Sequence, residues 1–261
     1  MVTRLPVQSF DVPPDRRPVF AYASEHAART AMPRHSHVHA QLIHATSGAI
    51  MVTANAGRWV VPPGQAVWMP SLEEHEIYAS TAVQMRTIYV APEVQGNFSP
   101  RCRVLRVAPL LRELIITAMS LPVVYALDAR DGKVMDLLLE EIRTAEELDF
   151  HVPMPSHTRL ADLCNRFVAN PAQDATLETW AHEMNMSSRT LSRLFLRETG
   201  MGFGDWCRRA RIVLSLPRLA EGCSILEVAL EHGYENPSAF AAMFRRELGV
   251  PPSVYSPRAG P

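Results

Sequence analysis

The chain has 261 residues, a length that suits two modest domains, and its 47% hydrophobic and 20% charged residues are typical of a globular protein with a real core. The formal net charge of -1 excludes binding of nucleic acid through an overall basic surface, so such binding would need a local group of Arg side chains. The 4 Cys include no Cys-x-x-Cys pair, which argues against a disulfide framework or structural zinc site. Without a signal-peptide pattern or a membrane-length apolar run, we expect a cytoplasmic protein with no membrane partner.

The first part of the chain reads as β-structure. From about Val19 to Pro92, short apolar or alternating runs are separated by Gly and Pro, and the clearest are QLIHATSG, AIMVTANAG, RWVVPPG, QAVWMP and VQMRTIYVAP. Strands at such close spacing predict an all-β sandwich or barrel.

Two helices are predicted to follow, from Pro109 to Leu121 and from Asp131 to Leu148, because apolar residues recur there at helical spacing. Each helix could belong to the core of the first domain or to a dimer interface, and the pattern leaves both open. The next segment, DFHVPMPS at residues 149–156, interrupts the helical pattern with two Pro. We place a domain boundary there.

The last third of the chain contains an internal repeat. The segments Trp180 to Trp206 and Val228 to Tyr255 each read as a short helix, a turn and a longer helix. The longer helices end alike, with FLRETG and FRRELG, so that Phe195 and Gly200 correspond to Phe244 and Gly249. A short helix, a tight turn and a second helix with an apolar inner face is the helix-turn-helix design.

The ends of the longer helices are predicted from local chemistry. Ser187 or Ser188 can cap the first, and Asn236 can cap the second before Pro at its first helical position. Gly200 and Gly249 can end the helices in the left-handed conformation that costs Gly little.

Residues from about 157 to 257 resemble the AraC/XylS family of transcription regulators, whose long signature is matched from Ser224 to Tyr255. The resemblance implies two helix-turn-helix subdomains joined by a linker helix at about Gly204 to Glu221. It also implies that each recognition helix enters the major groove of double-stranded DNA. Pro217 lies inside the linker and predicts a kink there.

The matched positions imply which side chains face DNA. On the first recognition helix the readers of base edges are Arg189, Ser192 and Arg193, with Ser188 at its start and Arg197 nearer a phosphate. The corresponding positions on the second helix are Pro237, Ser238, Ala241, Ala242 and Arg245. Small side chains cannot make bidentate base contacts, so we expect the first unit to carry most of the direct readout and the second mainly to position the protein.

A His-rich segment, RHSHVHAQLIHATSG, begins at Arg34, and His75 follows a Pro-x-Gly turn later in the chain. This resembles the cupin barrels that serve as sensors in one branch of the AraC family. The resemblance assigns His35, His37 and His75 to a metal site, with Gln41 where the family usually has Glu. Imidazoles and an amide oxygen suit a divalent transition metal, namely Zn, Ni, Fe or Cu. A small organic effector without metal and an empty structural cavity remain open alternatives.

The sequence therefore predicts an α+β multidomain protein. Residues 1–108 form a cupin-like β-barrel sensor, 109–156 a helical linker that could dimerise, and 157–261 an all-α domain of two helix-turn-helix units. The predicted function is a non-enzymatic, sequence-specific transcriptional regulator whose DNA binding is controlled by a metal or small-molecule effector. We expect a homodimer, with RNA polymerase as a candidate partner. The alternatives are a metal-dependent cupin enzyme with an accessory helical domain and a helical protein-interaction module.

Overall fold

The computed structural model describes residues 17–79, 81–96 and 98–256. The chain divides into two compact units. The first consists of Met1–Ile50 and Pro63–Asp149, and the second of Met51–Pro62 and Phe150–Pro261. Among the described residues, no helix combines the length and the apolar character needed to cross a membrane.

The first unit contains a six-stranded antiparallel sheet in the order β1-β8-β3-β6-β9-β10. Its strands are β1 (Val19–His26), β3 (Ala40–Ser47), β6 (Gln65–Met69), β8 (Val83–Val90), β9 (Arg103–Arg106) and β10 (Glu147–Leu148). Alternation along the strands sorts the side chains between two faces. One face, which includes Leu42, Trp68 and Ile88, packs into the hydrophobic core of this unit.

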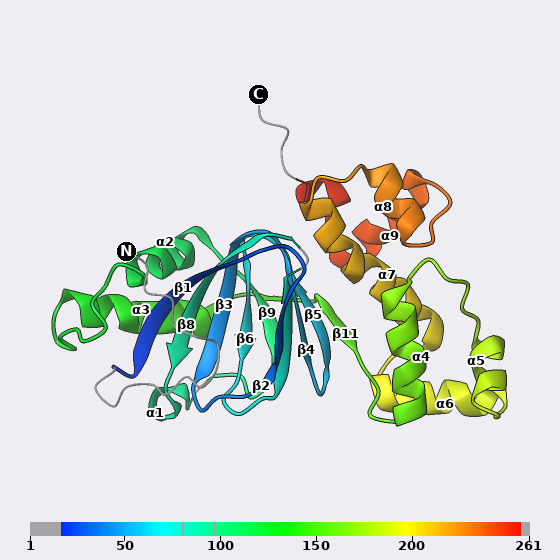
Figure 1. Cartoon of the computed structure of the whole chain (residues 1–261), viewed down its shortest axis with the longest axis horizontal. Coiled ribbons are helices and arrows are strands. Elements are labelled where there is room, and N and C mark those ends of the chain that lie inside the picture. Colours follow the sequence, from blue (N-terminus) through cyan, green and yellow to red (C-terminus); the bar gives the residue numbers. More distant parts are fainter. Residues whose placement is uncertain (1–16, 80, 97, 257–261) are drawn as a thin grey trace. The chain divides into compact units, whose positions relative to one another are not determined.

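Two helices cover that face of the sheet (Figure 1): α2 (Pro109–Ala118) and α3 (Arg130–Thr144). A short helix, α1 (Pro92–Gln95), follows β8. Leu111, Ile115, Leu138 and Ile142 are fully buried against the sheet residues, so these helices contribute to the core of the first unit.

Both helices end earlier than the periodicity predicts. α2 stops at Ala118, because the chain turns before Pro122 and a residue that precedes Pro is disfavoured in the helical conformation. The prediction that the second helix reaches Leu148 is wrong, since α3 ends at Thr144 and residues Glu147–Leu148 pair with β9 as β10. Tertiary pairing there outweighs the helical propensity of the sequence.

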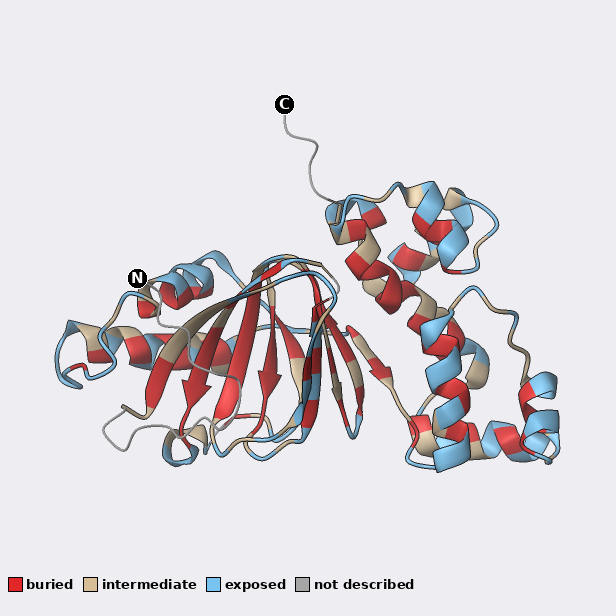
Figure 2. Ribbon diagram, viewed as in Figure 1, coloured by how far each residue is buried: buried red, intermediate tan, exposed pale blue. Residues whose placement is uncertain are grey.

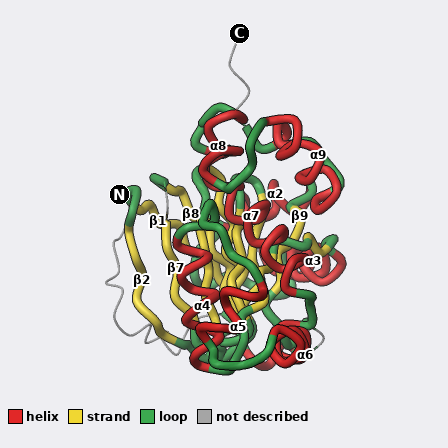
Figure 3. The backbone as a smooth tube through the Cα atoms, turned by 90° about the vertical axis from the view of Figure 1, so that its right-hand side faces the viewer, coloured by secondary structure: helices red, strands yellow, loops and turns green. Residues whose placement is uncertain are grey.

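In the first unit, a further pair of antiparallel strands brings together histidines that are far apart in the sequence. β2 (Thr30–His35) runs beside β7 (His75–Ala79) (Figure 3), and the register places His35 opposite His75. An irregularity between Met32 and His35 shifts the register just before that pair. This position, at one end of the strand pair, defines the site described below.

The second unit is built mainly of helices: α4 (Thr158–Ala169), α5 (Leu177–Glu183), α6 (Ser188–Thr199), α7 (Phe203–Ala220), α8 (Ile225–Glu231) and α9 (Pro237–Leu248). The short 3-10 helix η1 (Pro252–Val254) follows α9. The unit also holds all but the first residue of β4 (Ile50–Ala54), together with β5 (Gly57–Val61) and β11 (His151–Pro153), of which β5 and β11 pair antiparallel.

The long helix α7 forms the centre of the second unit, and most of its residues from Trp206 to Leu219 are buried (Figure 2). Trp206 contacts the rings of Phe167, Trp180 and Phe195, which belong to α4, α5 and α6. The helix runs through Pro217, whose carbonyl accepts a hydrogen bond from the N–H of Glu221 at 2.9 Å. The kink that Pro217 predicts stays a prediction.

Gly132 tests the packing of the first unit. A Cβ at this position would lie 1.9 Å from the backbone carbonyl oxygen of Leu127, so we predict that Gly132→Ala lowers the free energy of unfolding by about 1–3 kcal/mol. Helix propensity alone predicts the opposite, a gain of about 1 kcal/mol. Urea denaturation distinguishes the two, and Lys133→Ala, at the neighbouring exposed position, serves as the control. A stabilised Gly132→Ala protein would contradict the close approach.

Candidate functional site

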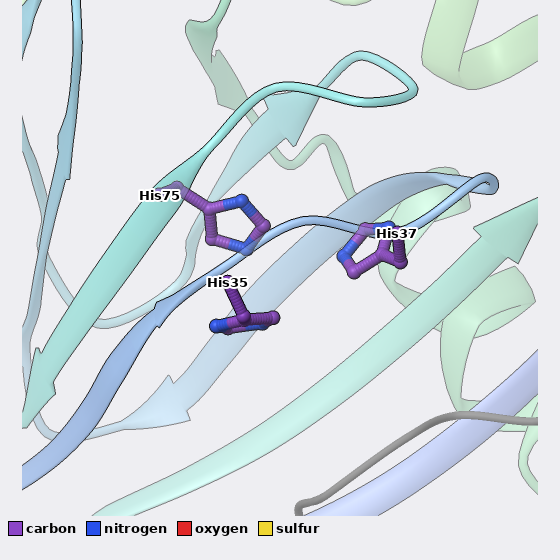
Figure 4. A group of neighbouring side chains, drawn as sticks. All are labelled: His35, His37 and His75. Atoms are coloured by element: carbon purple, nitrogen blue, oxygen red, sulfur yellow. The ribbon is translucent and has the colours of Figure 1, made fainter.

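Three histidines converge at one end of the β2–β7 pair (Figure 4). His35 ends β2, His37 follows in the next loop, and His75 begins β7. One ring nitrogen from each lies within 4.8 Å of the others. The ring centroids are 4.4 Å apart for His35 and His75, and 5.2 Å apart for His37 and His75. The structure thus brings together the three histidines that the cupin resemblance assigns to a metal site.

Each of these rings is held by a backbone carbonyl at Nδ1. The Nδ1 atoms of His35 and His75 lie 2.8 Å from the carbonyl oxygens of Pro33 and Glu73, and Nδ1 of His37 lies 2.6 Å from that of His39. A carbonyl oxygen can only accept, so Nδ1 must carry the proton in each ring. The neutral ring then keeps its lone pair on Nε2. A backbone carbonyl that accepts from Nδ1–H and fixes the tautomer in this way is typical of metal-binding histidines.

Burial keeps two of these rings neutral. It lowers the pKa of His75 from 6.5 to about 4, and it also lowers the pKa of His37. The neighbouring histidines lower both pKa values further, because two positive rings would repel each other. At neutral pH the lone pairs are therefore available to a cation.

Gln41 on β3 joins the histidines. Its Oε1 lies 2.9 Å from Nε2 of His37, and its amide nitrogen donates to the hydroxyl of Tyr89 at 3.2 Å. Both ring nitrogens of His37 therefore face oxygen atoms, although a neutral imidazole carries only one N–H. A cation bound between Nε2 and Oε1 would satisfy both lone pairs. Nε2 of His75, in contrast, is buried and has no hydrogen-bond partner within the described structure.

Two other histidines of the same segment lie apart from this cluster. His44 is buried on β3, and its Nδ1 bonds to the carbonyl oxygen of Gln65 at 2.9 Å. The ring of His39 packs edge-on against Phe20 at 5.5 Å. Neither belongs to the group of ring nitrogens that converge.

A cavity adjoins the histidine cluster and shares His35 and Gln41 with it. Its walls come from β1, β2, β3, β7 and β8. Apolar side chains and tyrosine rings form most of the surface: Met32, Ile77, Met85, Tyr22 and Tyr89. Ser24, His26 and Thr87 complete the wall. Among the described residues that line this cavity, none is Asp, Glu, Lys or Arg.

The residues that line the cavity could not be predicted from the sequence. The strands that carry Tyr22, Met32 and Met85 alternate between two faces, so the pattern shows that half of their residues turn inward. It does not show which inward residues are left uncovered next to the histidines. Only the pairing of Gln41 with Tyr89 and of Tyr22 with Thr87 places them around one space.

The first helix-turn-helix unit consists of α5 and α6. Ser187 caps α6 by accepting from the N–H of Thr190 at 3.2 Å, and Gly200 ends the helix with φ 72°. Asn185 takes φ 55° in the turn, which Asn tolerates better than most residues. Leu191 and Phe195 are fully buried and fix the inner face of α6.

The outer face of α6 is cationic. A surface hollow on this face is lined by Arg189, Arg193 and Arg197 together with Thr190 and Leu194. Arg189, Ser192 and Arg193 are exposed, as the resemblance implies for readers of base edges, and Ser188 is half-buried at the start of the helix. Three guanidinium groups on one helix face form the local cationic surface that a chain of net charge -1 needs to bind DNA.

The second helix-turn-helix unit consists of α8 and α9. Asn236 caps α9 by accepting from the N–H of Ala239 at 2.8 Å, and Gly233 and Gly249 take φ 76° and 75°. The predicted outward positions differ in exposure. Ser238, Ala242 and Arg245 are exposed, whereas Pro237 and Ala241 are half-buried.

Two family models match this chain. Residues 17–163 match the AraC-like ligand binding domain, and residues 180–258 match a helix-turn-helix domain. The chain belongs to the AraC family of transcriptional regulators. It is a DNA-binding regulator with a ligand-binding N-terminal domain, and the matched ligand-binding region contains both the histidine cluster and the cavity.

Curated relatives agree with this family. The HTH-type transcriptional regulator NimR of Escherichia coli is 30% identical over 261 residues, which cover 99% of this chain and 94% of NimR. RipA of Corynebacterium glutamicum is 34% identical over 104 residues, 40% of this chain and 31% of RipA. Among solved structures, ToxT from Vibrio cholerae covers 92% of this chain and 98% of its own at 10% identity, with a TM-score of 0.38.

The cap of the first recognition helix can be tested directly. Ser187→Ala removes the side-chain acceptor for the N–H of Thr190, so it is expected to lower the free energy of unfolding by about 1 kcal/mol. Ser188→Ala, one residue along, removes no cap and should change the free energy by less than about 0.5 kcal/mol. Urea denaturation measures both, and equal effects would show that Ser187 is not the cap that matters.

Proposed function

We propose that this regulator binds a divalent transition metal (Zn, Ni, Fe or Cu) through His35, His37 and His75, and that occupancy of this site controls DNA binding. The observation that carries the proposal is that all three rings bond at Nδ1 to a backbone carbonyl, which places the lone pair of each ring on Nε2. This arrangement supports metal binding more strongly than the presence of three histidines does.

The residues present fit such an ion. Three neutral imidazoles with an adjacent amide oxygen are the ligands that borderline metals accept, and the 2.9 Å between Nε2 of His37 and Oε1 of Gln41 suits two ligands of one ion. The usual carboxylate is absent, so the site favours metals that tolerate nitrogen-rich coordination. Bound here, the ion would supply a Lewis-acidic centre at the end of the cavity.

The ligands join separate parts of the first unit. His35 ends β2, His75 begins β7, and Gln41 lies on β3, where it also contacts Tyr89 of β8. An ion held by these residues stabilises one arrangement of the strand ends over others. If that arrangement also binds DNA better or worse than the others do, the ion changes the affinity for DNA. DNA then changes the affinity for the ion by the same factor, because coupling between two sites is reciprocal.

On the DNA side, we propose that Arg189 and Arg193 read base edges and that Arg197 contacts phosphate. Their exposure on one face of α6 and the shared hollow support this assignment. The short side chains of Ser238 and Ala242 on α9 leave the second unit mainly a positioning role.

A homodimer remains a proposal, and one feature of the first unit supports it. Leu110 and Ile116 on α2 and Leu137 on α3 are exposed, at 49%, 42% and 45% of their maximum. Exposed apolar side chains on adjacent helices suit an interface between two copies.

The alternative of a metal-dependent cupin enzyme predicts turnover by the isolated protein, and the carboxylate ligand usual in such a site is replaced here by Gln41.

Metal binding is tested by elemental analysis after purification and by titration with Zn²⁺. Wild-type protein is expected to hold about one ion per chain, and His37→Ala should lose it because one of three imidazole ligands is removed. His39→Ala is the matched control, since its ring lies outside the cluster and its backbone carbonyl still holds His37. DNA affinity should respond to Zn²⁺ in the wild type and in His39→Ala, but not in His37→Ala. Retention of the ion by His37→Ala would contradict the proposed site.

The roles on α6 are separated by two substitutions. Arg193→Ala should weaken binding to the specific DNA site by about 1–3 kcal/mol while leaving nonspecific binding nearly unchanged. Arg197→Ala should weaken specific and nonspecific binding alike and reduce the salt dependence by about one phosphate contact. Fluorescence anisotropy with both DNA types, at several salt concentrations, measures these effects. Equal loss on both DNA types for Arg193→Ala would show that it does not read a base.

A further inference from the structure

We infer that the ligand of the N-terminal unit is a small molecule with two parts: an anionic donor group that binds the metal ion directly, and an uncharged, mainly apolar body that fills the adjoining cavity. This inference rests on the proposed metal site, because it assigns the ion a direct role in holding the ligand. It names the chemical class of the effector, which the family model leaves open.

The charge of the site calls for an anion. His35, His37, His75 and Gln41 are all neutral as ligands, so a divalent ion would keep both of its positive charges. Glu74, on the loop before His75, is an exposed carboxylate paired with Arg34 at 3.3 Å. A donor that carries a negative charge and binds at an open coordination position is therefore the complement that this site lacks.

The cavity restricts the rest of the ligand. Along β8, Tyr89, Thr87 and Met85 turn toward it in succession, over roughly 13 Å at the usual rise of a strand. Tyr89 lies nearest the histidines, because its hydroxyl accepts from Gln41, which contacts His37. Ile77 and Met32, which pair between β7 and β2, form another part of the wall. The cavity thus extends from the proposed metal site, where His35 and Gln41 line it, to Met85 farther along β8.

The lining also excludes several ligand classes. A second charged group away from the metal would be buried without a partner, because no Asp, Glu, Lys or Arg is among the described lining residues, and burial lowers the pKa of His26. Ser24, His26 and Thr87 offer few hydrogen bonds, and two of them already bond to each other at 3.0 Å. Sugars, amino acids and phosphosugars would leave polar groups unsatisfied here, whereas an apolar body with one anionic end would not.

The test uses full-length protein loaded with Co²⁺, whose visible absorption reports on its ligands. Three probes are titrated: benzohydroxamate, with a metal-binding anion and an apolar ring; acetohydroxamate, with the same anion and no ring; and benzamide, with the ring and no such anion. Benzohydroxamate should change the Co²⁺ spectrum and bind at least about tenfold more tightly than acetohydroxamate, because its ring is buried in the cavity. Benzamide should not change the spectrum.

Two neighbouring residues of β7 locate the apolar part. Ile77 lines the cavity and Tyr78 is exposed on the opposite face, so Ile77→Ala should weaken benzohydroxamate binding by about fivefold or more while Tyr78→Ala should not. Ile77→Val, a smaller change, should give a smaller loss in the same direction and guards against misfolding of the Ala variant. Acetohydroxamate affinity should be the same in all of these proteins.

The outcomes separate the two proposals. Failure to bind Co²⁺ stoichiometrically, with His37→Ala no different from wild type, overturns the proposed metal site itself. Stoichiometric Co²⁺ with no spectral response to benzohydroxamate, or with equal affinity for both hydroxamates, leaves the metal site standing and overturns the inference about the ligand. A ring-dependent affinity that Ile77→Ala does not change would place the apolar body outside this cavity and overturn the inference as well.

Discussion

The Nδ1–H groups of three histidines donate to backbone carbonyls, and the ability of the N-terminal unit to bind a metal ion depends on this constraint. A carbonyl oxygen accepts hydrogen bonds but never donates them, so the contacts to the carbonyls of Pro33, His39 and Glu73 fix the tautomer of each ring. The lone pairs are thereby assigned to the Nε2 atoms. Burial then disfavours protonation of His37 and His75 in this nitrogen-rich site, and the adjoining cavity has no Asp, Glu, Lys or Arg among its described lining residues.

The second unit shows how strand segments and DNA-binding helices share one core. Trp206 on α7 donates to the carbonyl oxygen of Pro153 at 2.7 Å, and Arg209 donates to that of His151 at 2.7 Å. β11 is in turn paired with β5, where Trp59 stacks on His151. Since both strands fall within the matched ligand-binding region, residues of that region are bonded directly to the helix that joins the two helix-turn-helix units. These bonds attach β11 to the helix that connects the two helix-turn-helix units.

Much of the fold follows from the sequence because its signals are local. The caps at Ser187 and Asn236, the terminal Gly200 and Gly249, and the buried Phe195 and Phe244 are all specified within a few residues, and the structure places them as the repeat predicts. Alternating apolar runs likewise predict the strands of the N-terminal region.

Features that depend on distant partners are less accessible. The strand Glu147–Leu148 forms only because β9 is beside it, so helical periodicity wrongly extends the preceding helix. The histidines of the site follow from the family resemblance, but their tautomers depend on backbone carbonyls whose positions no residue pattern encodes. The same holds for the cavity, which exists because Tyr22, Met32 and Met85, from three different strands, leave space beside Gln41. Only the backbone conformation distinguishes Ser187 from Ser188 as the residue that caps α6.

Coupling between the N-terminal site and the DNA-binding unit can be measured as the affinity of the protein for Zn²⁺ with and without saturating DNA from upstream of its own gene. Linkage requires that any effect of the metal on DNA binding appears with equal size as an effect of DNA on metal binding. We predict that bound DNA shifts the Zn²⁺ affinity by about fivefold or more, with His37→Ala, which should not hold the ion, as the negative control. Identical Zn²⁺ affinities with and without bound DNA would contradict it.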